Sequence, residues 1–241
     1  MKALIAVAAL LVTASQACAS GTTNSLAFPT AAEWCQSAPW CGFTADNKAW
    51  PRKAQKSSYP TVPLSNLTFT INAPAAFKGL TVPAGAQATL VARYPGYRIA
   101  VSLEDLPEPT AETGTADLTA ARARSKRRPI DVFDILFTAK PEQAEPKNRF
   151  EAWLWRSAFA IKARFYESAT KAEIRRNGKW TAFIADVKRS PYTRATVITH
   201  KDIPSRYLRI LDTGAPDNVI VALIASVELD ALPAKATKEG G

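Results

Sequence analysis

The chain has 241 residues, of which 47% are hydrophobic and 22% are charged, and six are tryptophan. This is the composition of a folded globular protein. Lysine and arginine number 31 against 21 acidic residues, so the formal net charge is +10 at pH 7. Such a surplus favours acidic partners, such as an acidic protein or an anionic envelope component, although a basic surface also serves solubility alone.

Residues 1–19 have the form of a secretory signal peptide. One positive charge precedes an unbroken apolar stretch over residues 3–12, and Ala17-Cys18-Ala19 has the small-x-small form of a cleavage site. The apolar stretch is shorter than the ~20 residues that a bilayer span needs, so we expect no transmembrane helix in the mature protein. Residues 15–18 also resemble a degenerate lipobox, in which Cys18 would be lipidated, and this alternative stays open.

Export determines how the partners and the cysteines are interpreted. We expect a periplasmic or secreted protein, or an outer-membrane lipoprotein if Cys18 carries lipid, and an exported address argues against nucleic acid as the partner. In an oxidising compartment Cys35 and Cys41 are predicted to form a disulfide, whose short loop is worth about 2 kcal/mol in the chain-entropy model. A metal site would need further ligands, and the one histidine, His200, is far away in sequence, so none is predicted.

The chain after the signal segment is divided into three parts. Residues 20–63 are predicted to form an irregular N-terminal arm that carries the disulfide, with a flexible joint at residues 48–56. Residues 64–230 are predicted to form one α+β core domain. Residues 231–241 are rich in Ala, Lys and Gly and are predicted to form a disordered tail.

The first half of the core domain is predicted to contain strands. Alternating apolar and polar residues indicate strands at 67–71, 88–93 and 97–103. Pro95-Gly96 between the last two is typical of a tight turn. A loop rich in Pro, Glu and Thr follows at residues 106–114.

Residues 117–128 are poor in apolar residues and contain the densest basic cluster of the chain. Three interpretations stay open: an electrostatic docking patch for an acidic partner, a solvated loop or helix end, and a dibasic processing site. The candidate partner-binding residues are Arg122, Arg124, Lys126, Arg127 and Arg128.

Two helices are predicted next. Residues 130–139 form a short one, and Asn148 is a suitable N-cap for a longer helix over residues 149–166. Aromatic residues follow the long helix at helical spacing, which indicates packing against a sheet rather than a cofactor site. Lys162 and Arg164 are expected to stay on its polar side.

The second half of the domain is predicted to be an antiparallel meander. Asn177-Gly178 suits a type I′ turn because both central residues need positive φ. Strands are indicated at 171–176, 179–188, 193–199 and 206–211. Pro216 and Asp217 open a last helix that we expect to lie on this sheet, beside or near the aromatic helix. Its apolar face consists of Val219, Ile220, Leu223, Ile224 and Val227.

The order of elements resembles the Mog1/PsbP-like α/β/α sandwich. The closest local match is Tyr207-Leu208-Arg209-Ile210-Leu211 followed by residues 217–227, a last strand followed by a helix with a Ser-aliphatic ending. The resemblance implies an antiparallel sheet flanked by helices. It also implies a non-catalytic role in binding or assembly, which is an analogy at the level of the fold.

Signatures of enzymatic chemistry are missing from the sequence. His200 is the only histidine and is predicted to lie at a surface strand end, and no Gly-x-Ser-x-Gly elbow, phosphate loop or dinucleotide fingerprint occurs. The acid pairs Glu104/Asp105 and Asp131/Asp134 are the nearest candidates for a carboxylate-based hydrolase. Ordinary strand-end and helix-start roles explain them equally well. We therefore assign no catalytic residue and no cofactor.

The sequence thus leads to one main expectation and two alternatives. The main one is an exported bacterial non-catalytic binding protein that recognises an acidic protein or envelope component. The alternatives are a periplasmic immunity or inhibitor protein against a secreted toxin, and a carboxylate-based hydrolase.

Overall fold

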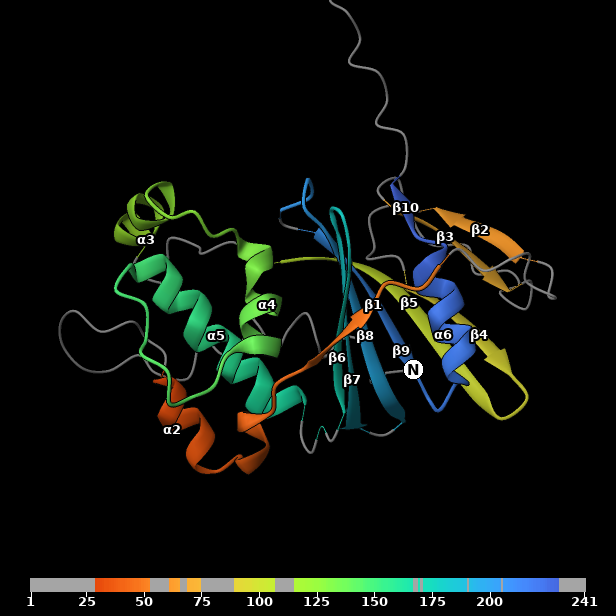
Figure 1. Cartoon of the computed structure of the whole chain (residues 1–241), viewed down its shortest axis with the longest axis horizontal. Coiled ribbons are helices and arrows are strands. Elements are labelled where there is room, and N and C mark those ends of the chain that lie inside the picture. The colour runs from red at the N-terminus through yellow and green to blue at the C-terminus, as the bar shows by residue number, and fades with distance from the viewer. Residues whose placement is uncertain are drawn as a thin grey trace, which may run out of the picture.

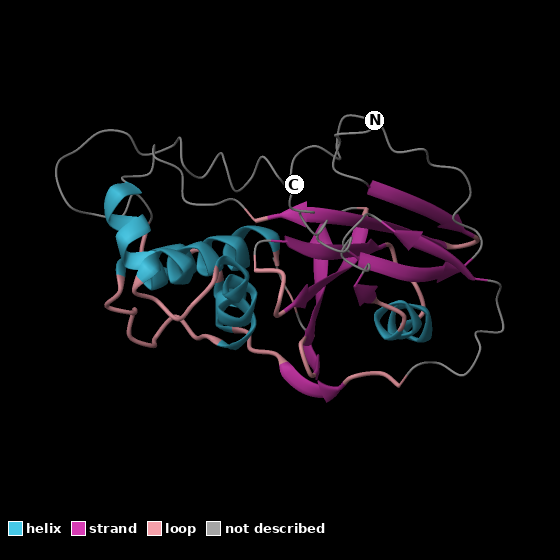
Figure 2. Ribbon diagram, turned by 90° about the horizontal axis from the view of Figure 1, so that it is seen from above, coloured by secondary structure: helices cyan, strands magenta, loops and turns pink. Residues whose placement is uncertain are grey.

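A seven-stranded sheet divides the protein into two halves, with α6 (Asp217–Ala225) on one face and the other helices on the opposite face (Figures 1 and 2). The computed structural model describes residues 29–52, 61–65, 69–74, 89–106, 115–166, 169, 171–189, 191–204 and 206–229. The predicted signal segment, Cys18 and the predicted tail lie outside the described residues. Within the described ranges, no helix is long and apolar enough to cross a membrane.

The main sheet is mixed and has the strand order β1-β6-β7-β8-β9-β5-β4. All neighbours are antiparallel except β1 and β6, which run parallel. The predicted meander, β6 to β9, and the predicted early hairpin, β4 and β5, are both confirmed, and β5 pairs with β9 to join them. The strands are β1 (Asp46–Ala49), β4 (Thr89–Tyr94), β5 (Tyr97–Asp105), β6 (Ala172–Asn177), β7 (Trp180–Arg189), β8 (Tyr192–His200) and β9 (Arg206–Asp212).

Glycine closes both predicted hairpins. Gly96 has a φ of 88° between β4 and β5, and Gly178 has a φ of 58° between β6 and β7. Both values lie in the left-handed region, which glycine adopts without a steric penalty. A second, three-stranded antiparallel sheet has the order β10-β3-β2, with β2 (Thr61–Ser65), β3 (Phe69–Pro74) and β10 (Glu228–Leu229).

The N-terminal region is more regular than the sequence predicted. It contains α2 (Ala31–Gln36), the 3₁₀ helix η1 (Pro39–Gly42) and strand β1. The expected flexible joint at residues 48–56 is wrong at its start, because Lys48 and Ala49 pair with Arg175 and Arg176 of β6. The pairing was invisible in the sequence because β1 is short and exposed and has no apolar alternation.

The cysteine pair links α2 to η1, next to the C-terminal end of the long helix α5 (Arg149–Phe165). Cys35 and Cys41 are at disulfide distance, with their Cα atoms 5.4 Å apart, inside the ~7 Å that a disulfide allows. Next to them, Trp40 Nε1 donates a hydrogen bond of 3.2 Å to the carbonyl of Ala163, and the guanidinium of Arg164 lies 4.5 Å from the ring centre of Trp34. Trp40 therefore supplies a hydrogen-bond donor to a carbonyl in the last turn of α5, where the helix itself has no further N–H groups to donate.

The helical face of the sheet is covered by α4 (Val132–Thr138) and α5, with α3 (Thr115–Ala123) at the periphery (Figure 1). Asn148 is the N-cap of α5, as predicted: its Oδ1 accepts hydrogen bonds from the backbone N–H groups of Phe150 and Glu151. The core here is aromatic, and the ring of Phe137 lies 5.2 Å from Phe183 and 5.5 Å from Tyr166.

Lys162 overturns one expectation about α5. The side chain was predicted on the polar side of the helix, but it is fully buried. Its Nζ donates to the carbonyl of Ala139 at 3.0 Å and lies 4.4 Å from the ring centre of Phe43. Burial lowers the pKa of Lys162 to about 8 because the charged form loses its hydration.

The closing helix also differs from its prediction. Its apolar residues do pack on the sheet, but on the face opposite α5, so the expected position beside the aromatic helix is wrong (Figure 2). The turn before it supplies the reason. The carboxylate of Asp212, buried at the end of β9, accepts hydrogen bonds from the N–H groups of Gly214 and Ala215 and from Arg194. These bonds direct the chain toward the face that Asp212 occupies.

Candidate functional site

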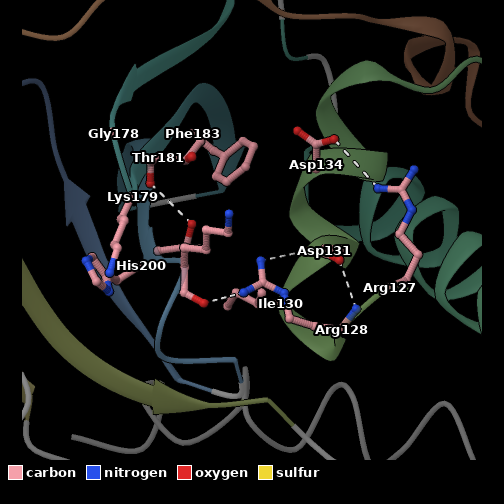
Figure 3. A pocket seen from close by; sticks show the side chains of 12 residues that line it. Arg127, Arg128, Ile130, Asp131, Asp134, Gly178, Lys179, Thr181, Phe183 and His200 are labelled. Atoms are coloured by element: carbon pink, nitrogen blue, oxygen red, sulfur yellow. Dashed lines mark hydrogen bonds and ion pairs between the residues drawn. The ribbon is translucent and has the colours of Figure 1, made fainter. Parts of the chain in front are cut away.

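A cleft of about 220 Å³ opens where the Arg-rich segment meets the ends of β7 and β8 (Figure 3). One wall comes from residues 127–134, which run through the 3₁₀ helix η3 (Pro129–Asp131) into α4. The other wall comes from the β6–β7 turn and the last residues of β8. Ile130 and Phe183 supply the apolar part of the lining. We call this site the basic cleft.

Arg128 and Asp131 build the first wall. The backbone N–H of Arg128 donates to Asp131 Oδ2 at 2.8 Å, and its guanidinium forms an ion pair with Oδ1 at 3.2 Å. The same guanidinium donates to the carbonyl of Lys201 on the opposite wall, and the N–H of Ile130 donates to the carbonyl of Pro204 at 3.1 Å. Arg128 is thus a structural bridge that fixes the two walls relative to each other.

The second wall carries two lysines on neighbouring strands. The register of β7 and β8 pairs Trp180 with His200, so Lys179 and Lys201 lie side by side just beyond this pair. The backbone N–H of Lys201 donates a hydrogen bond of 2.9 Å to the carbonyl of Lys179. Lys179 Nζ lies 2.6 Å from Asp202 Oδ2, and this hydrogen bond lowers the pKa of Asp202. Lys201 is exposed and has no carboxylate within ion-pair distance in the described part of the chain.

Asp134 links the cleft to the edge of the sheet. Its Oδ1 lies 2.7 Å from one guanidinium nitrogen of Arg176 in β6. The other terminal nitrogen of Arg176 donates a hydrogen bond to the side chain of Asn47 in β1. Arg127 lies only at the outer limit of an ion pair with Asp134, 4.0 Å away, and its side chain is 47% exposed. Asp134 is therefore held mainly by Arg176, and Arg127 remains open to another anion.

The cleft as a whole carries excess positive charge. Around it lie five cationic side chains, including Arg176, against three carboxylates. Arg128, Lys179 and Arg176 are each matched by one carboxylate at 3.2 Å or less. Arg127 and Lys201 account for the residual charge of +2, which favours an anionic ligand.

The structure separates the five predicted partner-binding residues into two groups. Arg127 and Arg128 line the basic cleft. Arg122 belongs to the last turn of α3, whereas Arg124 and Lys126 are exposed in the following loop, and none of these three lines the cleft. The predicted cluster is thus spread along its segment, and the structure brings its C-terminal members, Arg127 and Arg128, to the cleft.

His200 does not lie at the surface, as the sequence had suggested, but is buried. Side chains alternate along a strand, so its ring lies on the α6 face with Ile198, away from Arg128 and Asp131 (Figure 3). The ring packs 4.5 Å from that of Trp180, and Nδ1 accepts a hydrogen bond from the N–H of Asp202. Burial lowers the pKa of His200 below its ordinary value.

The candidate acid pairs differ in their surroundings. Glu104 is buried beside Tyr207 and Arg209, whereas its neighbour Asp105 is exposed and pairs with Arg206 at 2.7 Å, so the two do not converge on a site. Asp131 and Asp134 both line the basic cleft, but each already accepts arginine donors. A carboxylate hydrolase needs one acid that gives up a proton and one that attacks or activates water. The arginine pairs favour a structural role for both.

Sequence reasoning missed Lys179 and Lys201. Lys179 was predicted as the first residue of a strand and Lys201 lies two residues beyond another predicted strand, but their proximity depends on the pairing register of β7 with β8. The approach of Lys201 to Arg128, 73 residues away along the chain, depends on how α4 packs on the sheet. Neither relation has a local sequence signal.

A scan against models of protein families finds no match to this chain, and a search of curated proteins finds none either. The functional argument therefore rests on the residues of the basic cleft.

Proposed function

We propose that this protein is an exported, non-catalytic binding protein, and that it recognises an anionic group of an acidic protein or envelope component in the basic cleft. The observation that carries the proposal is the pair of cations, Arg127 and Lys201, that line the same cleft: Arg127 has a long 4.0 Å contact with Asp134, and Lys201 has no carboxylate within ion-pair distance in the described residues. The cysteine pair at disulfide distance is compatible with an oxidising compartment.

The organisation of the cleft supports a binding role. Arg128 holds the two walls together through its contacts with Asp131 and Lys201, so the cations are positioned before a ligand arrives. Positioning in advance lowers the entropic cost of binding. The charge around the cleft also raises the rate at which an anionic partner is captured, and salt weakens this effect.

The test compares cleft residues with neighbours of the same charge. The double variant Arg127→Gln/Lys201→Gln removes two charges from the cleft, and the control Arg124→Gln/Lys126→Gln removes two from the adjacent loop. Each purified protein is immobilised and exposed to an envelope extract at 50 and 300 mM salt. We expect wild type and control to retain the same anionic component at low salt and to release it at high salt.

The cleft variant is expected to lose this component at both salt concentrations. Equal capture by the cleft variant and the control, or capture that does not depend on salt, would contradict the proposal. The identity of the retained component then separates the two kinds of binding protein: a secreted toxin indicates an inhibitor, and an envelope component indicates an assembly or anchoring role.

A further inference from the structure

We infer that the anionic group recognised by the basic cleft is a phosphate monoester, bound in the cleft that Arg127, Lys179 and Lys201 line. This inference rests on the proposed function, because it names the ligand chemistry of the same site. It is argued from the size of the cleft, from its residual charge and from the contact that a ligand would replace.

The size of the cleft limits the ligand to one small group. Its volume is about 220 Å³, whereas pockets that enclose a whole drug-sized molecule measure roughly 300–1,000 Å³. A phosphoryl group with part of its ester substituent fits such a volume, and the rest of the ligand would extend into solvent. Recognition is then directed at the charged end of a molecule.

The residual charge of the cleft matches a dianion. The ion pairs of Arg128, Lys179 and Arg176 leave Arg127 and Lys201 as the two cations without a matched carboxylate in the described residues. A phosphate monoester carries about −1.5 to −2 charges at pH 7 and presents three acceptor oxygens. A carboxylate carries only one charge and would leave the cleft with a net positive charge.

The donors around the cleft also suit a group with several acceptors. Lys179 and Lys201 lie on one wall, side by side, and Arg127 belongs to the other wall, where its guanidinium turns toward Asp134 (Figure 3). Binding replaces the long 4.0 Å contact of Arg127 with Asp134, which Arg176 already holds at 2.7 Å. Lys179 keeps its 2.6 Å contact with Asp202 and donates through its remaining ammonium protons. Charge-assisted hydrogen bonds from Arg and Lys to phosphoryl oxygens are among the stronger polar contacts in proteins.

The first experiment measures calorimetric binding of matched small probes to the purified protein. Phenyl phosphate, benzoate and phenyl sulfate share an aromatic body and differ in the charge and shape of the anionic group. We expect phenyl phosphate to bind at least about tenfold more tightly than the two monoanions, as the second unpaired cation adds one further charge-assisted contact.

The second experiment varies the charge of the ligand through pH. The second pKa of a phosphate monoester is about 6, so lowering the pH from 7.5 to 5.5 reduces its dianionic fraction, and with it the affinity, by about fourfold. Inorganic sulfate stays a dianion at both values and controls for titration of the protein, including that of His200. Its affinity is expected to change less than that of phenyl phosphate.

Matched variants locate the binding. Lys201→Gln is expected to weaken phenyl phosphate binding by about tenfold, whereas Lys126→Gln, which removes the same charge one residue before Arg127, leaves it unchanged. Asp134→Asn raises the residual charge of the cleft and is expected to tighten binding. The melting temperature of each variant is compared with that of the wild type to show that it is folded.

The outcomes separate this inference from the proposed function. Benzoate binding as tightly as phenyl phosphate, with the affinity of both lowered by Lys201→Gln, overturns the phosphate assignment but supports an anion-binding cleft. Equal effects of Lys201→Gln and Lys126→Gln overturn both. If phenyl phosphate binds, vesicles containing phosphatidic acid distinguish the source of the monoester: their capture assigns a lipid headgroup, and its absence assigns a soluble ligand.

Discussion

The two faces of the main sheet differ in the apolar side chains that they bury. On the α6 face the buried apolar core is aliphatic and includes Ile198, Ile210, Leu223 and Ile224. Its buried polar groups are His200 and the carboxylate of Asp212, which pairs with Arg194. The helical face buries aromatic rings together with charged groups, such as Lys162 and the ion pair of Glu104 with Arg209. Aliphatic packing tolerates substitutions that keep volume and pattern, whereas a buried charge needs its particular partners. The face with the aromatic core is also the face whose rim carries the basic cleft.

The largest effect is expected from the buried acid of the helical face. Glu104 accepts hydrogen bonds from Ser102 Oγ at 2.9 Å and Tyr207 OH at 2.6 Å and pairs with Arg209. Glu104→Ala leaves the guanidinium buried without its carboxylate, and we expect a loss of about 3–5 kcal/mol in the free energy of unfolding. Urea denaturation measures it.

The neighbouring acid is the matched control for this prediction. Asp105, whose side chain is 62% exposed, pairs with Arg206. Asp105→Ala is expected to cost less than about 1 kcal/mol because water screens the pair. Similar losses for Glu104→Ala and Asp105→Ala would show that burial of the charge does not set the cost.

The α6 face should respond to loss of volume instead. Leu223 is 1% exposed in the middle of the apolar stripe of α6. Leu223→Ala is expected to lower the free energy of unfolding by about 2–5 kcal/mol, through lost transfer energy and the cavity that remains. Asn218→Ala, at an exposed position of the same helix, should change it by less than about 0.5 kcal/mol. A mild effect at Leu223 would mean that α6 does not belong to the core.

The third prediction concerns the Cys35–Cys41 pair on the helical face. The double variant Cys35→Ser/Cys41→Ser is expected to lose about 2 kcal/mol, because the short closed loop no longer limits the unfolded chain. Reduction of the wild type should lower its stability by the same amount, and non-reducing peptide mapping should show the two cysteines linked. If a reductant leaves the denaturation midpoint of the wild type unchanged, the bond contributes nothing to stability.

The smallest effect is a change of stability with pH. Lys162 has a pKa of about 8 in the folded protein and one near 10.4 in the unfolded chain. Between these values the unfolded state binds more protons, so stability rises with pH across this window, and below pH 8 the folded state bears the cost of the buried charge. The gain from pH 7 to 9.5 is at most about 2 kcal/mol.

Replacement of Lys162 isolates this contribution. Lys162→Met is expected to be more stable than the wild type at pH 7, with a difference that shrinks toward pH 9.5. Denaturation of both proteins at the two pH values measures the change. A difference that stays constant with pH would mean that the lysine does not titrate in this window.

Local signals predicted much of the fold. The Pro95-Gly96 turn and the Asn148 cap depend on the conformations of single residues, and the structure confirms both. The hairpin predicted at Asn177-Gly178 is also present, but Asn177 pairs with Trp180, so the two turn residues are Gly178 and Lys179, one position later than predicted. Relations between distant segments could not be predicted in the same way. The burial of Lys162 depends on Ala139 and Phe43, which come from other segments, and the face chosen by α6 depends on the bonds of Asp212.

The residues of the basic cleft also fall into those that the sequence predicted and those that only the tertiary structure brings together. Arg127 and Arg128 belong to a basic cluster that is visible in the sequence, so they could be named in advance. Lys179 and Lys201 could not, because strand register and helix packing bring them to the cleft. Charge density in the sequence therefore identified a segment, and the tertiary structure selected which of its residues face a cavity.

The most direct measurement of the central claim is a titration with phenyl phosphate followed by amide chemical shifts in the ¹⁵N-labelled protein. The account predicts saturable shifts that concentrate at residues 127–131, 178–181 and 199–201, and that disappear in Arg127→Gln/Lys201→Gln. Shifts that do not saturate, or that spread over Arg124, Lys126 and other exposed cations, would contradict it, because the positive charge would then act as a diffuse surface and not as a site.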